Sequence, residues 1–148
     1  MITIRTNSEN KHFINLVKEV DAYLKITDGL EHDFYNQFNN IDVLEHVVVV
    51  FLGDVAVGCG ALKKFNEDAM EVKRMYVSAE NRGTGIAQQI LAELEIWAAA
   101  LGYKSCVLET GKRQIEAVKF YHKCNYQVIP NYGQYAVMEN SICFEKVL

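Results

Sequence analysis

The sequence has a single proline, Pro130, and no tract rich in proline, serine or charge of one sign. Disordered and fibrous chains need such tracts, whereas half of the residues here are hydrophobic. No basic segment followed by an apolar run opens the chain, and no stretch approaches the ~18 apolar residues of a membrane span. We therefore expect a globular, cytoplasmic protein with no membrane partner.

Positive charge is also in deficit, since 15 Lys and Arg residues face 19 Asp and Glu residues. Without a basic stripe and interleaved aromatic rings, nucleic acid is not expected as a partner. The four cysteines form no C-x-x-C pair, and His122 with Cys124 is two ligands short of a zinc site. We expect reduced thiols and no metal.

The spacing of apolar and turn residues predicts strands and helices along the whole chain, with no linker between them. The expected strands cover residues 2–6, 46–52, 55–62, 70–77, 106–108, 126–129 and 141–147. The expected helices cover residues 13–24, 30–38, 85–101 and 116–124, with Gly102 as a C-terminal cap. The hairpin 46–62 is antiparallel, and the strand, helix and strand across 70–108 form a parallel crossover. The fold class is therefore α/β with a mixed sheet.

The strand at 70–77 changes phase along its length. In a regular strand the even-numbered Met70 and Val72 would point to one face, and the odd-numbered Met75 and Val77 would point to the other. One extra residue near positions 73–74 would return both pairs to the same face, which is what a β-bulge does. Because bulges often lie beside active sites, this strand becomes a candidate for a functional position.

After that strand, a turn containing Gly83 and Gly85 leads into the long helix. Free amide groups and the macrodipole at a helix N-terminus favour an anion such as a pyrophosphate, and Arg82 adds charge. A turn that needs glycine for its backbone angles is the competing interpretation. The loop is no P-loop, because no lysine followed by serine or threonine closes it, and it lacks the first glycine of the dinucleotide fingerprint.

The motif Arg82-x-x-Gly85-x-Ala87 resembles the acyl-CoA signature Q/R-x-x-G-x-G/A of the GNAT superfamily of N-acyltransferases. Residues 71–77 are similar to the fourth strand of that family, and residues 108–126 to its fifth strand and following helix. The usual Gly-Phe pair is replaced by Asn125-Tyr126, and asparagine tolerates a positive φ. The resemblance implies one domain over residues 1–148, with a mostly antiparallel sheet, flanked by helices, that splays between those two strands.

The same resemblance implies acetyl-CoA as co-substrate, with its pantetheine in the splay and its pyrophosphate on the glycine loop. The residues implied in binding are Met75, Tyr76, Val77, Arg82, Gly83, Thr84, Gly85, Ile86 and Ala87. Lys119 on the following helix is a further candidate for the phosphates, and a solvated helix face is the competing interpretation.

The implied chemistry is direct attack of an amine on the thioester. Glu71, six residues before Val77, resembles in position the catalytic base of some family members, and Glu109 is the second candidate. A solvated glutamate beside Lys73 is the competing interpretation of Glu71. Tyr121 resembles the tyrosine that donates to the departing thiolate, with core packing as the competing interpretation.

We expect an N-acetyltransferase that acts on a primary amine of a small molecule or peptide. Two alternatives are acetylation of protein N-termini or lysines, and a non-catalytic acyl-CoA sensor. The family implies a homodimer and an acceptor site on the first helices and late strands. The candidates there are Asp21, Tyr23, His32, Tyr35 and residues 132–135.

Overall fold

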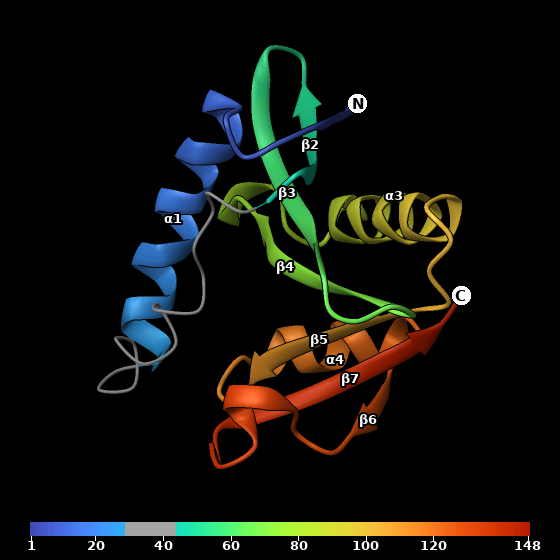
Figure 1. Ribbon diagram of the computed structural model, residues 1–148. Coiled ribbons are helices and arrows are strands. Elements are labelled where there is room, and N and C mark those ends of the chain that lie inside the picture. The colour runs from blue at the N-terminus through green and yellow to red at the C-terminus, as the bar shows by residue number, and fades with distance from the viewer. Residues whose placement is uncertain (29–43) are drawn as a thin grey trace.

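The computed structural model describes residues 1–28 and 44–148 (Figure 1). The strands are β1 (Ile2–Thr6), β2 (His46–Leu52), β3 (Val55–Lys64), β4 (Ala69–Val77), β5 (Ser105–Gly111), β6 (Gln127–Ile129) and β7 (Ser141–Val147). The helices are α1 (Lys11–Asp28), α3 (Ile86–Ala100) and α4 (Ile115–Lys123), with short 3-10 turns η3 (Ala79–Asn81) and η4 (Gly133–Tyr135). The helix predicted at 30–38 and the candidates His32 and Tyr35 lie outside the described residues.

The strands of the described residues form one sheet in the order β1-β2-β3-β4-β5-β7-β6. The neighbours in it are antiparallel except β4 and β5, which are parallel. The predicted α/β class with a mixed, mostly antiparallel sheet is therefore confirmed. No helix within residues 1–28 or 44–148 is both long and apolar enough to cross a membrane.

Helices cover both faces of the sheet (Figure 1). In β2, Val48 and Val50 join the core cluster beneath α3, whereas Val47 and Val49 join the cluster beneath α1. The strand is apolar from Val47 to Leu52, and Val47 to Val50 are buried on both of its faces. On the other half of the sheet, α4 packs on the same face as α3, and η4 packs on the face of α1.

The helix α3 lies directly on β3, a contact that the periodicity did not predict. A Cβ atom added at Gly60 would come within 2.7 Å of the Met75 sulfur and 2.9 Å of Leu94. At Gly58 it would come within 2.9 Å of Ile90. These two glycines let the helix approach closely, and so its N-terminus comes to lie beside the end of β4.

The bulge predicted in β4 is present. Cys59 pairs with Tyr76 and Ala61 pairs with Lys73, so β4 has one residue more than β3 between these two pairs. Arg74 takes up the extra residue with a φ of 57°, in the left-handed region. Because the bulge bends its strand, β4 turns away from β5 beyond this point.

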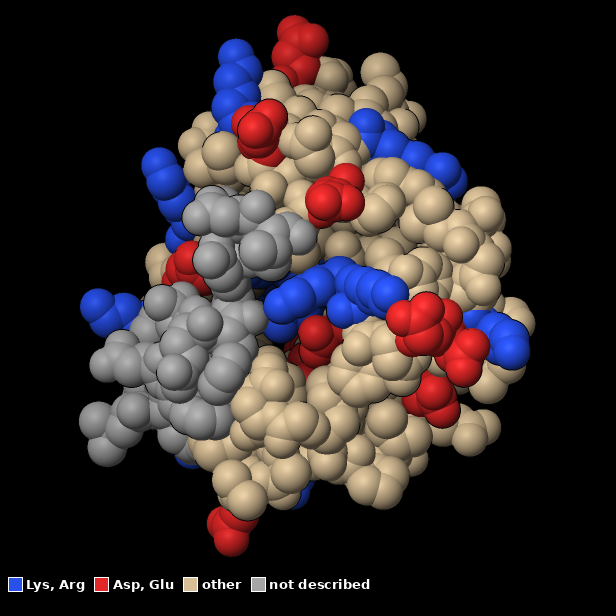
Figure 2. Space-filling view, in the orientation of Figure 1, with Lys and Arg blue, Asp and Glu red and all other residues tan. Residues whose placement is uncertain are grey.

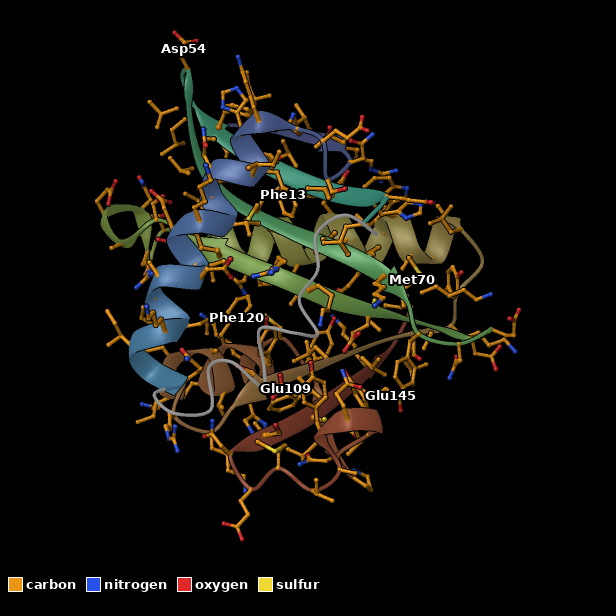
Figure 3. All side chains as sticks on the ribbon, turned by 60° about the vertical axis from the view of Figure 1, so that its left-hand side comes forward. Phe13, Asp54, Met70, Glu109, Phe120 and Glu145 are labelled. Carbon is orange, nitrogen blue, oxygen red and sulfur yellow. The ribbon has the colours of Figure 1, made fainter. Side chains whose placement is uncertain are left out.

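The splay between β4 and β5 is also present. The two strands pair from Ala69–Ser105 to Glu71–Val107, and no pairing follows. In Figure 3, Met70 lies near the end where the two strands run together, and Glu109 lies on the part of β5 that has separated.

Several local predictions hold to within a residue or two. The helix expected at 116–124 is α4, and the strand expected at 141–147 is β7. Gly102, with a φ of 95°, follows the end of α3, and Asn125 has the expected positive φ of 71°. Leu101 was expected on the apolar face of the helix but lies beyond its end and is exposed.

Candidate active site

A pocket of about 320 Å³ opens where β4 and β5 separate. In Figure 2, acidic and basic side chains lie next to each other in the hollow at the centre of the face shown. The pocket is lined by seven of the residues predicted for catalysis or coenzyme binding, namely Glu71, Met75, Tyr76, Val77, Arg82, Glu109 and Tyr121. Two of the acceptor candidates, Tyr23 and Tyr135, line it as well. Lys119 is exposed on α4 and does not line it.

Glu71 is the last residue of β4 that pairs with β5. Its side chain is only 8% exposed, and the hydroxyl group of Tyr132 donates a hydrogen bond of 2.7 Å to its Oε2. The interpretation of Glu71 as a solvated surface glutamate is therefore wrong. Its carboxyl group therefore lies where a ligand in the pocket can contact it.

Glu109 and Lys73 line the same part of the pocket from β5 and β4. Burial lowers the pKa of the Lys73 ammonium group, and the nearby carboxylates of Glu71 and Glu109 oppose that change. Two acidic groups and one partly desolvated cation thus share a small volume.

Tyr121 reaches the pocket from the opposite face of the sheet. It belongs to the core cluster of α3 and α4 and is 6% exposed. Its ring contacts those of Phe120, Tyr126 and Phe144 at centroid distances of 5.2, 5.8 and 5.9 Å. Burial raises the pKa of its phenol above the usual range, so the hydroxyl group stays protonated and can donate.

The glycine loop before α3 fits an anionic group. Gly83 and Gly85 have φ values of 76° and 86°, and the space beside both is open. No side chain caps the amides at the start of α3. Ile86 turns its side chain into the core, so only its backbone faces the loop. Thr84 donates its hydroxyl to the carbonyl of Asn81 at 2.6 Å.

Arg82 folds back from this loop along the pocket. Its Nε donates to the carbonyl oxygen of Val77 at 2.9 Å. The guanidinium group lies over the rings of Tyr23 and Tyr76, at 5.4 and 5.6 Å from their centroids. Arg82 therefore links the end of β4 to α1, and Tyr23 belongs to this contact.

Asp21 forms an ion pair with Arg74, the residue that carries the bulge. The Arg74 side chain is 5% exposed. Asp21 was predicted at the acceptor site, and no role was predicted for Arg74 beyond the bulge. The only signal for this pair was the phase slip, which marked the position of Arg74 but not its partner. Gln114, directly before α4, also lines the pocket and was not anticipated.

Comparisons with known proteins agree with this geometry. The model of the acetyltransferase (GNAT) family matches residues 14–126. An IAA acetyltransferase from Azospirillum brasilense is 31% identical over 140 residues, which cover 91% of this chain and 90% of the relative. The chain therefore belongs to the GNAT acetyltransferase family.

Solved structures show the same fold. A protein from Klebsiella pneumoniae, classed as an acyl-CoA N-acyltransferase, superposes with a TM-score of 0.83 at 26% identity, covering 99% of this chain and 97% of that one. The PaiA N-acetyltransferase from Thermoplasma acidophilum, solved in complex with coenzyme A, superposes with a TM-score of 0.73 at 18% identity over 100% of both chains.

Proposed function

We propose that the protein transfers the acetyl group of acetyl-CoA to a primary amine of a small molecule or peptide by direct attack. The observation that carries this proposal is the opening between β4 and β5. It places Glu71 on one face of the sheet and Tyr121 on the other, at a single pocket. A base and a donor on opposite sides of one opening suit two substrates that meet inside it.

The glycine loop and the end of β4 bind acetyl-CoA in this proposal. The uncapped amides of α3 and the positive end of its dipole face the pyrophosphate, beside Gly83 and Gly85. Met75, Tyr76 and Val77 lie along the arm of the coenzyme. The hydrogen bond from Arg82 occupies the Val77 carbonyl, so Arg82 exchanges this partner for the phosphates on binding. Lys119 does not line the pocket, so the phosphates of the coenzyme are the group that it would contact.

Glu71 is the base that prepares the amine. A lysine-like amine has a pKa of about 10.4, so holding it neutral at pH 7 costs roughly 4 to 5 kcal/mol. Glu71 takes the proton directly or through a water molecule, and the neutral nitrogen attacks the thioester carbonyl carbon. Glu109 is the second candidate for this role, because it lines the same pocket from β5.

Tyr121 stabilises the departing thiolate. The nitrogen of the tetrahedral intermediate releases its remaining extra proton to water as the intermediate collapses. The carbon–sulfur bond then breaks and leaves negative charge on sulfur, to which the phenol hydroxyl group donates a hydrogen bond. Because burial raises the pKa of Tyr121, full proton transfer to the thiolate is unfavourable. Hydrogen bonding is therefore its main contribution.

The test is a panel of amines incubated with acetyl-CoA and the protein, with free CoA thiol and the mass of the acetylated product as readouts. We expect thiol release that depends on at least one small amine or peptide. The mass of that acceptor should increase by one acetyl group. Acetyl-CoA binding without release across the panel would indicate a non-catalytic sensor. Turnover only with folded proteins would indicate a protein acetyltransferase instead.

We also place the enzyme in the cytoplasm, as one domain over residues 1–148. The four free cysteines support a reducing compartment. A homodimer is the assembly that we expect, and light scattering of the purified protein measures it.

A further inference from the structure

One side chain contacts the catalytic candidate Glu71 without lining the pocket. Tyr132 lies between β6 and β7, 61 residues from Glu71 in the sequence, and donates to its Oε2 at 2.7 Å. It is half-buried, and it does not line the pocket itself. Tyr132 can therefore affect the reaction only through its hydrogen bond to Glu71.

The ring of Tyr132 is held from two sides. Phe65, from the turn between β3 and β4, makes an edge contact at 4.7 Å, and Tyr135 makes another at 5.9 Å. The segment that carries Tyr132 is fastened by Asn131, whose Nδ2 atom lies 3.0 to 3.3 Å from three backbone carbonyl oxygens. These contacts limit the directions in which the phenol hydroxyl can point.

We propose that Tyr132 is a positioning residue for Glu71. It binds one carboxylate oxygen, Oε2, and so leaves Oε1 to face the acceptor amine or its water molecule. It also stabilises the ionised carboxylate, which is the form that a base requires. The proposal rests on the function proposed above for Glu71.

The charges around Glu71 show why a donor is needed. Lys73 on β4 and Tyr135 of η4 each lie near the carboxyl groups of both Glu71 and Glu109, and Lys63 pairs opposite Glu71 on β3. Because Glu71 is buried among these groups, the hydroxyl group of Tyr132 supplies a hydrogen-bond donor in place of water. Burial and the nearby Glu71 raise the pKa of Tyr132 above its usual range, so the phenol remains a donor throughout the working pH range.

The test is Tyr132→Phe, which keeps the ring and removes the donor. A hydrogen bond to a charged group typically shifts ionisation by about 1 to 2 pH units, so the acidic limb of the kcat/KM profile should move to higher pH by that amount. Activity should fall about tenfold or more on this limb and recover at high pH. A uniform loss at every pH would indicate a merely structural role and would overturn the proposal.

The matched control is Tyr126→Phe. Tyr126 also donates to a glutamate, the Oε2 of Glu95, at 2.8 Å, but on the far side of the sheet from Glu71. This variant loses the same kind of bond and should leave the acidic limb in place. Phe65→Leu, which loosens the ring of Tyr132 and keeps its hydroxyl, should shift the limb by less than Tyr132→Phe.

A second readout does not depend on turnover. In protein with isotopically labelled glutamate, the side-chain carboxyl resonance of Glu71 is assigned by its loss in Glu71→Gln. Its titration midpoint should move to higher pH in Tyr132→Phe, and an unchanged midpoint overturns the proposal. If the wild-type protein acetylates no amine, the proposed function fails while this titration still decides the role of Tyr132.

Discussion

The two faces of the sheet differ in what shapes the opening between β4 and β5: backbone on one face and side chains on the other. On the face of α3 and α4, the shape comes from the backbone: two left-handed glycines, an uncapped helix start and a close helix–strand contact. On the face of α1 and η4, it comes from side chains that meet across long stretches of sequence, as in the pairs Tyr132–Glu71 and Arg74–Asp21. A backbone-built site suits a coenzyme common to the whole family, and a side-chain-built site suits an acceptor that differs between members.

The strongest challenge to this comparison is Glu71→Gln. Loss of a general base typically lowers kcat by a factor of about 100 to 10,000, while acetyl-CoA binding on the other face should be retained. Steady-state kinetics with the accepted amine and calorimetry with acetyl-CoA measure the two effects. Glu109→Gln is the companion variant, and a larger loss there would move the role of base to Glu109.

Tyr121→Phe tests the donor that reaches the pocket from the α4 face. The change keeps the ring contacts and removes the hydroxyl, so kcat should fall about 10- to 100-fold with little change in stability. Because burial raises the pKa of Tyr121, its ionisation should not produce a basic limb below about pH 10 in the wild-type profile. A basic limb that disappears in Tyr121→Phe would contradict this.

Gly85→Ala tests the backbone-built side. An alanine held at a positive φ costs about 1 to 2 kcal/mol, and the displaced amides should weaken acetyl-CoA binding about tenfold. Gly53→Ala is the matched control, since Gly53 also has a positive φ of 61° and open space around it, in the β2–β3 turn away from the pocket. Both variants should lose similar stability, and equal losses of affinity would argue against the glycine loop as the coenzyme site.

The smallest expected effect concerns one buried thiol group beneath each face of the sheet. Burial raises the pKa of Cys59 beneath α1 and of Cys106 beneath α3 to about 12. A thiol in the unfolded chain titrates near pH 8.5, so the stability held by the neutral buried thiols is present below that pH and is lost as pH rises towards 12.

In urea unfolding between about pH 8.5 and pH 10, each such thiol should lower the free energy of unfolding by up to ~1.4 kcal/mol per pH unit. Cys59→Ala and Cys106→Ala should each remove one thiol's share of that slope, besides a constant cost for the cavity. A slope that either variant leaves unchanged would show that its thiol is not shielded from water.

Features that depend on a few neighbouring residues were accessible from the sequence. The phase slip between Met70–Val72 and Met75–Val77 predicted a bulge near residues 73–74, and the structure places it at Arg74. Likewise Gly102 marked the end of α3, and Asn125 marked a left-handed residue after α4. The resemblance to the GNAT signature then related these elements to a splayed sheet, which the pairing of β4 with β5 confirms.

The partners of the polar side chains were not accessible in the same way. Tyr132 and Asp21 were both assigned to the acceptor, yet one binds Glu71 and the other binds Arg74. Lys119 was grouped with the coenzyme site; it is exposed on α4 and does not line the pocket, and its contact with the phosphates stays a prediction.

By itself, the sequence determined the order of the elements, the bulge and the glycine loop, because hydrophobic periodicity and backbone φ are set by a residue and its near neighbours. Only the tertiary structure decided that Glu71 is buried, that Tyr132 holds it, and that Arg82 reaches back to Val77. Such contacts depend on which strands lie side by side, and a hydrogen bond forms only when that packing brings donor and acceptor to within about 3 Å.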